Sequence, residues 1–372
     1  MKWLFAGLVG LHGLIHLMGF AKAFGYASLP QLVQPISRAM GLLWLVAAAL
    51  LLSASVGSLA WPRSWWWMGA ASLVVSQFVI VSSWSDAKFG TLANLILAVG
   101  AAVAFATYGP SSLHAEFDRE ARGAIARGGP GPVVSEADLV SMPDPVRRYV
   151  RLSGAVGQPR VRNFHAVFAG RIRGGPKAAW MTFTGEQYNF YGPAERLFIL
   201  DATRSGLPVV AFHRFQGAAA TMRVKVASIF PVVDASGPEM LKAETVTLFN
   251  DLCVFAPGAL ADPAIGWREV DATHAIGRYV REGVAVEARL TFDDQGRLID
   301  FISDDRLAGS PDGRSFTPMR WSTPLRDYRT FGAATLSASG AGRWHPPGEE
   351  AYDYIELQLK DIRYNLSSRA TQ

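Results

Sequence analysis

The first 108 residues contain almost no ionisable side chains. They hold a single acid, Asp86, and five basic residues, namely Lys2, Lys22, Arg38, Arg63 and Lys88. About a quarter of the residues of an ordinary soluble domain are charged, because they have to face water. This scarcity excludes a water-soluble fold for the segment and predicts that it lies in lipid.

The rest of the chain has no excess of positive charge. Of 36 basic and 31 acidic residues in the protein, 31 and 30 lie beyond position 108, so this part is close to neutral. A nucleic-acid interface needs basic residues gathered on one face, so no nucleic-acid partner is expected. The single cysteine, Cys253, excludes an intramolecular disulfide and lies in an apolar stretch typical of a buried thiol.

The usual signatures of catalysis are also missing. The sequence has no glycine-rich phosphate loop, no Gly-x-Ser-x-Gly elbow, no His-Glu-x-x-His and no Cys-x-x-Cys. This excludes the commonest routes to an enzyme. No cofactor and no metal site are predicted.

Four uncharged apolar runs have the length that a helix needs to cross a bilayer, at 3–20, 40–59, 65–84 and 91–108. We expect residues 1–108 to form a compact transmembrane bundle of about four helices in the cytoplasmic membrane, with Trp61 and Trp65 to Trp67 at the lipid–water interface. With the N-terminus inside, the cytoplasmic flanks carry five basic residues against three outside. That asymmetry predicts a cytoplasmic soluble domain.

Polar residues inside the apolar runs require an explanation, because buried polarity is costly in lipid. His12 and His16 are four positions apart and therefore share one helical face. They could relay protons or electrons, or they could hydrogen-bond to Asn94, Gln77 or Ser76 and hold the bundle together. Two histidines without a third ligand are too few side chains to coordinate a metal ion.

Beyond the bundle, residues 109–159 predict an amphipathic helix, a Gly-Pro linker and a second helix that starts at Asp144 as its N-cap. From residue 160 to 372 the apolar period is mostly two, which predicts about ten strands. One helix interrupts them at 240–255, after a capping box from Ser236 to Glu239. We expect a curled antiparallel sheet, a half-barrel, around this helix.

Candidate catalytic side chains are few. His165, His213 and Glu186 could converge if their strands are neighbours, and would then form a metal site or a general base. Asp327 and Tyr328 are further candidates. Each has a simpler interpretation as a hydrogen-bonded or solvated strand residue.

Candidate ligand-binding residues are aromatic. Trp321 belongs to the densest polar and aromatic cluster, together with Arg326, Asp327 and Tyr328, and we expect Tyr188, Tyr191 and Trp180 near it. The alternative is that the aromatic rings fill the core while Arg326 and Asp327 form an ion pair.

Several sequence runs carry a resemblance. They are GLIH at 13–16, GEQYNFYG at 185–192, WSTPLRDY at 321–328 and DIRYN at 361–365. They resemble an uncharacterised bacterial membrane-protein family, a domain of unknown function fused to N-terminal spans. More loosely, the strand order with one embedded helix is similar to the half-barrel of bacterial lipoprotein carriers of the LolA and LolB type. That second resemblance implies an apolar cleft for acyl chains.

Three hypotheses follow. The first is a membrane-tethered protein that binds a lipid or another apolar small molecule, with the bilayer as its partner. The second is a membrane-associated hydrolase or isomerase with a polar pocket in the β domain. The third places redox or proton transfer at His12 and His16. The sequence identifies no protein partner.

Overall fold

The computed structural model describes residues 2–129 and 131–367. Their contacts divide the chain into two compact units. The first contains the residues up to Glu116 together with Ala227–Ile229, and the second contains Phe117–Val226 and the residues from Phe230 onward.

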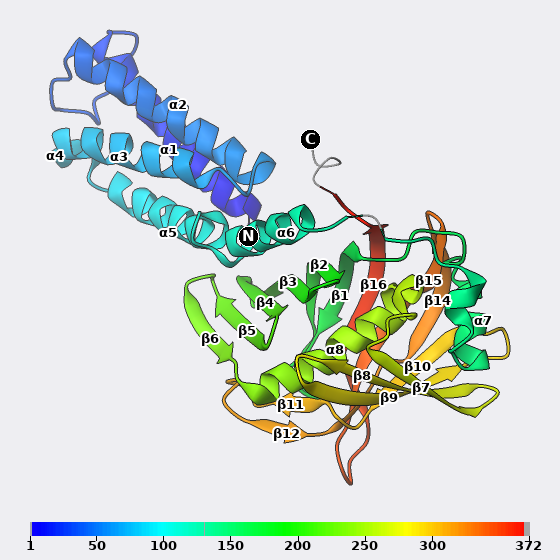
Figure 1. The fold of residues 1–372 in the computed structure, drawn as a ribbon. Helices are drawn as coiled ribbons and strands as arrows, with labels where there is room; N and C mark the ends of the chain where they lie inside the picture. Colours follow the sequence, from blue (N-terminus) through cyan, green and yellow to red (C-terminus); the bar gives the residue numbers. More distant parts are fainter. Residues whose placement is uncertain (1, 130, 368–372) are drawn as a thin grey trace. The chain divides into compact units, whose positions relative to one another are not determined.

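The first unit is helical (Figure 1). Its helices are α1 (Lys2–Ala23), α2 (Arg38–Ala60), α3 (Trp66–Ser82), α4 (Trp84–Ala87) and α5 (Gly90–Tyr108), followed by the start of α6 (Leu113–Ala126). Helix α1 packs against α2 and α5, and α3 packs against the same two helices, so the four long helices form a ring.

Three helical segments of the described chain are long and apolar enough to cross a membrane: α1, α2 and the segment Gly90–Ala126, whose apolar part is α5. The third expected run, at 65–84, is divided, because α3 stops after 17 residues and α4 starts at Trp84. The structure therefore supports three candidate spans and a shorter apolar helix. Trp65 is another difference from expectation, since it is buried against Val9, Leu51 and Leu97 instead of facing an interface.

The second unit begins with short helices. They are the remainder of α6 from Phe117, a 3-10 turn η1 (Glu136–Leu139) and α7 (Asp144–Leu152). Helix α7 buries Val146, Tyr149 and Val150. Its N-cap is Pro143 and not Asp144, whose side chain instead accepts a hydrogen bond from Arg147 at 2.7 Å.

The second unit is dominated by one antiparallel sheet. The strands of this unit come in two series, β1 to β6 and β7 to β16. The first series is β1 (Asn163–Ile172), β2 (Met181–Tyr191), β3 (Ala194–Arg204), β4 (Leu207–Gln216), β5 (Ala219–Val226) and β6 (Phe230–Ala235). The second is β7 (Ile265–Asp271), β8 (His274–Arg281), β9 (Val284–Phe292), β10 (Leu298–Ser303), β11 (Leu307–Gly309), β12 (Phe316–Pro318), β13 (Arg320–Ser322), β14 (Leu325–Phe331), β15 (Ala334–His345) and β16 (Tyr352–Tyr364).

The described sheet has 14 strands, so the expectation of about ten was too low. Its order is β6-β5-β4-β3-β2-β1-β16-β15-β13-β10-β9-β8-β7, with β14 paired to β15, and β11 and β12 form a separate ribbon. The sheet is not closed, because β6 and β7 end the order without pairing to each other. Strands β12 and β13 are separated by a single residue but belong to different sheets.

Helix α8 (Pro238–Phe255) lies within the curve of the sheet (Figure 1). It contacts β5, β9 and β15, which are far apart in the strand order, so the sheet curls around it as expected. The predicted capping box does not form. The N-cap is Gly237, whose φ of 98° suits glycine, and no side chain caps the helix.

Candidate ligand-binding cavity

The concave face of the sheet is polar at one end and apolar at the other. Alternate residues of a strand share one face, and paired strands place these residues in rows. Asn189 pairs with Arg196 across β2 and β3, and Gln187 lies in the next row. That second row continues through Phe198 to His213 on β4.

The following rows contain only apolar residues and glycine. Leu200 pairs with Gly185 on one side and with Ala211 on the other, and Ala211 pairs with Val224 on β5. Ala202 pairs with Val209 one row further on. Along these strands the concave face therefore changes from polar residues in the first two rows to apolar residues in the following rows.

Helix α8 presents one face to the same space. Glu244, Thr247, Asp251 and Val254 recur at spacings of three and four, so they lie on one side of the helix. Sheet and helix together enclose a cavity of about 250 Å³. Ligand pockets measure roughly 300–1,000 Å³, so this cavity is slightly smaller than that range and has room only for a small ligand or for part of a larger one.

Most of the cavity wall is apolar. The apolar side chains come from the sheet and from the end of α8; they are Phe168, Ile172, Met181, Phe198, Leu200, Ala202, Val209, Ala211, Met222, Val224, Val254, Phe255, Leu325, Ile355, Leu357 and Leu359. The charged and titratable wall residues are Arg196, His213, Glu244, Asp251, Arg306 and Tyr354.

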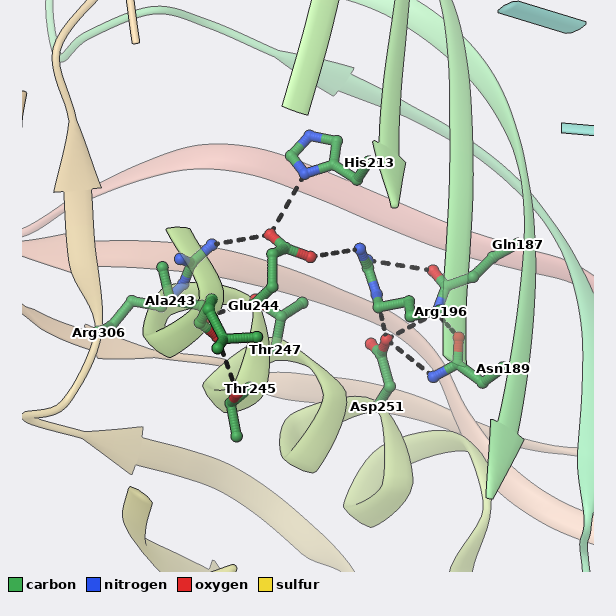
Figure 2. Close-up of polar contacts among 11 residues, drawn as sticks. Gln187, Asn189, Arg196, His213, Ala243, Glu244, Thr245, Thr247, Asp251 and Arg306 are labelled. Carbon is green, nitrogen blue, oxygen red and sulfur yellow. Dashed lines mark hydrogen bonds and ion pairs between the residues drawn. The ribbon is translucent and has the colours of Figure 1, made fainter. Parts of the chain in front are cut away.

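Arg196 is the centre of a buried ion cluster (Figure 2). Its Nε donates to Asp251 Oδ2 at 2.6 Å, and one terminal nitrogen donates to Glu244 Oε2 at 3.0 Å. The three side chains are between 1% and 6% exposed. Pairing with two carboxylates makes the burial of this guanidinium tolerable, because an unpaired buried charge is very costly.

Three basic side chains surround Glu244 (Figure 2). Besides Arg196, His213 Nδ1 lies 3.3 Å from Oε1, and an Arg306 terminal nitrogen lies 3.9 Å from the same oxygen. Burial alone would raise the pKa of Glu244, but these neighbours, Arg196 first, lower that pKa to about 2. Glu244 is therefore an ionised carboxylate at neutral pH.

Asp251 is held by three donors on one oxygen. Gln187 Nε2 donates to Oδ2 at 2.7 Å and Asn189 Nδ2 donates at 3.1 Å, in addition to Arg196. Burial raises the pKa of Asp251, while Arg196 and Asn189 oppose that rise. The carboxylate form is the one that accepts all three hydrogen bonds on Oδ2.

Arg306 Nε is a buried donor of the cavity wall with no acceptor among residues 2–129 and 131–367. The Arg306 guanidinium carbon lies 5.6 Å from the ring centre of Trp321 and 5.8 Å from that of Trp344. The indole N–H of Trp321 is also buried, and its hydrogen bond to the Tyr354 hydroxyl opposes the rise that burial causes in the pKa of Tyr354.

The structure brings together two of the three residues that could have converged, His165 and Glu186, and places His213 elsewhere. His165 Nε2 lies 3.3 Å from Glu186 Oε2, and Tyr188 stacks on His165 with ring centres 4.4 Å apart. Tyr188 also contacts Phe117, so this group lies on the face of the sheet that α6 covers. His213 lies on the concave face with Glu244 instead.

Among the aromatic candidates, only Trp321 lines the cavity. Tyr191 is buried beside the cluster, where its hydroxyl lies 3.4 Å from Asn189 Nδ2. Trp180 lies elsewhere, with Arg171 and Arg173 each 4.5 Å from its ring centre.

The expected cluster around Trp321 does not assemble. Asp327 accepts a hydrogen bond from Ser339 at 2.7 Å and is exposed. The Tyr328 hydroxyl donates to the carbonyl of Leu298 at 2.8 Å. No ion pair joins Arg326 to Asp327 in the described part of the chain.

The polar residues of the apolar helices hydrogen-bond to one another. Asn94 Oδ1 lies 3.1 Å from His12 Nε2 and 3.0 Å from Ser76 Oγ, and Ser76 Oγ lies 3.0 Å from His16 Nε2. Asn94 Nδ2 donates to Gln77 Oε1 at 3.0 Å. His16 Nδ1 lies 2.9 Å from the carbonyl oxygen of His12, so both of its ring nitrogens have partners. In the described residues no three His, Cys, Asp or Glu side chains gather as a metal site.

Sequence reasoning missed Arg196, Glu244, Asp251 and Arg306. A signal was present for two of them, because Glu244 and Asp251 are seven residues apart on the apolar face of a buried helix. Acids at such positions require buried partners.

Comparison with known proteins identifies the family of this chain and two solved structures with weak similarity to it. The chain is similar to a DUF1329 family protein from Desulfovibrio piger, at 12% identity and a TM-score of 0.34, over 65% of this chain and 100% of that one. It is also similar to a candidate outer membrane lipoprotein-sorting protein domain from Vibrio parahaemolyticus, at 11% identity and a TM-score of 0.27, over 54% and 85% of the two chains. No curated protein matches. A family model covers residues 132–357, more than half of the chain, and the protein therefore belongs to DUF6544, a family of unknown function.

Proposed function

We propose that this protein is a membrane-tethered binding protein for an amphipathic ligand, whose apolar part occupies the cavity of the β domain. The observation that supports this most strongly is the cavity itself. It is lined mainly by aliphatic and aromatic side chains and has charged groups at one end. Apolar pockets with a few fixed polar groups are the usual form of small-molecule sites.

The ion cluster gives the pocket a rigid polar end. Arg196, Glu244 and Asp251 satisfy one another, so they do not have to move when a ligand enters. Apolar surface removed from water then supplies the affinity, at roughly 25 cal/mol per Å². The polar end supplies orientation, because a ligand polar group at the apolar end would lose its hydrogen bonds.

The enzyme hypothesis receives less support from the geometry. It required at least two of His213, Glu186, Asp327 and Tyr328 in one pocket, and only His213 lines the cavity. We therefore favour binding over catalysis.

The apolar helices of the first unit would hold the protein in the cytoplasmic membrane, and we propose that the β domain faces the cytoplasm. This sidedness rests on the basic residues that flank the apolar runs. A ligand that partitions into the bilayer would then be close to the cavity.

A cavity-filling variant tests the proposal. Ala211 lines the cavity at mid-sheet, so Ala211→Phe places a ring in the space that a ligand would occupy. We expect the full-length protein, purified in nanodiscs, to retain a lipid in native mass spectrometry and Ala211→Phe to lose it. The thermal unfolding temperature should change little, because the added ring enters a void.

The matched control is Ala285→Phe on β9, where the alanine is exposed. It should retain the lipid. If Ala211→Phe retains the same lipid as the unchanged protein, or if the unchanged protein retains none after addition of excess monoacylglycerol, the cavity is not a lipid site.

A further inference from the structure

We propose that the β domain makes its own contact with the membrane, through the β5–β6 turn and the start of β6. This segment, residues 226–233, is called the membrane-contacting edge below. Its partner is the lipid bilayer that holds the apolar helices, at the level of the headgroups and the first acyl carbons. The proposal goes beyond the cavity and does not depend on whether the cavity holds a ligand.

The composition of this edge is typical of a membrane contact. Between Lys225 and Asp234 the sequence reads VASIFPVV, eight residues without a charge. Ile229, Phe230 and Val232 are 44%, 62% and 47% exposed. A single exposed apolar residue needs no explanation, but three within four positions form an apolar patch. Such patches indicate a surface that contacts another protein or a membrane.

The turn is attached to one end of the helical unit. Ala227–Ile229 belong to that unit by their contacts, and the Ser228 hydroxyl oxygen lies 2.8 Å from that of Thr107. Thr107 lies in the last turn of α5, which is the apolar part of a candidate membrane span. Ile229 and Phe230 follow Ser228 directly in the chain. They therefore lie within two residues of a contact with the end of this span.

Tryptophans mark this end of the helical unit as a lipid–water interface. Phe5, near the start of α1, packs on Trp65 before α3, with ring centres 5.4 Å apart. Trp66, at the start of α3, packs on Phe105 near the end of α5, at 5.0 Å. Three tryptophans at these helix ends and at the end of α2 are more than half exposed: Trp3, Trp61 and Trp67. Tryptophan is enriched at the headgroup level, so the end of α5 and the attached turn lie at that level.

The conformation of the turn is held by packing. Ala227 and Ser228 have φ values of 51° and 56°, in the left-handed region that side-chain-bearing residues rarely adopt. Both residues are buried. Tertiary contacts, and not local preference, therefore keep this conformation, and Ile229 and Phe230 extend from a fixed base.

The apolar end of the concave face continues to the same edge. Ala202 pairs with Val209, Val209 with Val226, and Val226 with Phe230. Directly paired residues share one face of a sheet. Phe230 therefore extends this apolar row from the cavity wall to the last strand of the sheet, which suits a contact with lipid.

A bilayer fits this edge better than a second copy of the chain does. Strand β6 ends the order of the described sheet, and an open edge strand can pair with a strand of another molecule. Pro231, within β6, lacks the N–H that such pairing uses. A lipid contact needs only the apolar side chains. The contact is shallow, because the backbone groups of an open edge have to remain in the hydrated headgroup region.

A fluorescent label at position 232 tests the proposal. The only cysteine, Cys253, is buried, so Val232→Cys can be labelled selectively in the full-length protein. The protein is placed in nanodiscs whose phosphatidylcholine carries a nitroxide quencher near the headgroup. Ala102→Cys, at an exposed position of α5, gives the quenching of a site in lipid. Val270→Cys is the matched control, because this valine is 43% exposed on β7, the opposite edge strand. We expect quenching at position 232 to be at least threefold stronger than at position 270.

A second variant tests whether the apolar side chains make the contact. Phe230→Asp, combined with Val232→Cys, places a charge at the most exposed position of the edge. We expect the quenching at position 232 to fall at least twofold. Quenching at Ala102→Cys should stay the same when Phe230→Asp is added. The thermal unfolding temperature should change little, because most of the Phe230 side chain is exposed.

The contrary outcomes are distinct. Equal quenching at positions 232 and 270 would overturn the proposal, and so would quenching at 232 that Phe230→Asp leaves unchanged. A disulfide between two copies at position 232, without quenching by the lipid, would assign the edge to a second copy. None of these measurements depends on a ligand in the cavity, so this proposal and the proposed function can fail separately.

Discussion

Removal of Arg196 should destabilise the β domain strongly. Arg196→Met keeps much of the side-chain volume but leaves Asp251 and Glu244 without their central cation. Breaking a buried ion pair in this way costs about 3–5 kcal/mol, out of the 5–15 kcal/mol that typically stabilise a domain. For a domain of this size each kcal/mol lowers Tm by about 2–4 °C, so a decrease of roughly 6–20 °C is expected.

The double variant Arg196→Met/Asp251→Asn provides the internal test. It removes one charge of each sign, and Glu244 retains Arg306 and His213 as neighbours. We expect a loss smaller than the sum of the two single losses, with a coupling of roughly 0.5–3 kcal/mol. Arg171→Met is the control on the same sheet, because its ion pair with Glu356 is exposed and should contribute at most about 1 kcal/mol.

The assay is thermal and urea unfolding of the full-length protein in nanodiscs, followed by circular dichroism in the β-sheet band. If Arg196→Met and Arg171→Met lower Tm equally, or if the losses at Arg196 and Asp251 simply add, the buried cluster is not the coupled unit that its distances indicate.

Three further predictions concern other parts of the molecule. The pKa of Glu244 is lowered from its ordinary value of 4.5 to about 2, so its ionised form stabilises the domain above about pH 4.5 and this contribution is lost as the pH falls toward 2. Glu244→Gln should therefore reduce the dependence of the unfolding free energy on pH between these values. Parallel pH dependences for the variant and the unchanged protein would contradict the lowered pKa of Glu244. Gly19→Ala would bring a Cβ within 2.2 Å of Trp44 and should destabilise the helical unit by about 1–3 kcal/mol. Gly7→Ala is the control, because its Cβ would meet nothing within 4 Å and should not destabilise the unit. Equal effects of the two variants on unfolding in detergent would refute the packing of α1 against α2. Cys253 is buried, so a maleimide should react only with an introduced cysteine. If the β domain faces the cytoplasm, the exposed position of Asp312→Cys should be labelled by a membrane-impermeant maleimide after lysis but not in intact cells. Labelling of intact cells would place the β domain on the outer side of the membrane.

Elements with regular periodicity could be predicted from the sequence. Charge-free runs predicted α1, α2 and α5, and the apolar period of two predicted that the chain beyond residue 160 forms strands, with the most regular alternation in β9. The buried helix α8 was also predicted, although its cap was not. In each of these cases the local pattern and the environment in the fold agree.

Strands with an interrupted pattern could not be predicted in the same way. Asp327 has a φ of 56° and is left unpaired between Arg326 and Tyr328, so β14 has no continuous alternation. Strand β15 contains the run Ser337 to Gly340, a composition typical of loops. Pairing with neighbouring strands, and not local propensity, makes these segments extended.

The candidate site was harder to predict than the fold. Arg196 meets Glu244 and Asp251 across 48 and 55 residues of sequence, and only the curl of the sheet around α8 brings them together. His213 was singled out from the sequence, but its partner Glu244 was not. A lone histidine on a strand does not reveal which side chain faces it.

The central claim is that an acyl chain occupies the concave side of the β domain. A monoacylglycerol with a diazirine near the end of its chain can be incorporated into nanodiscs with the full-length protein, photolysed and located by peptide mass spectrometry. We expect the label on cavity-lining residues of the apolar end, such as Leu200, Ala211 and Val224, and its loss in Ala211→Phe. Label confined to the apolar helices of the first unit, with none on the concave face, would contradict the account.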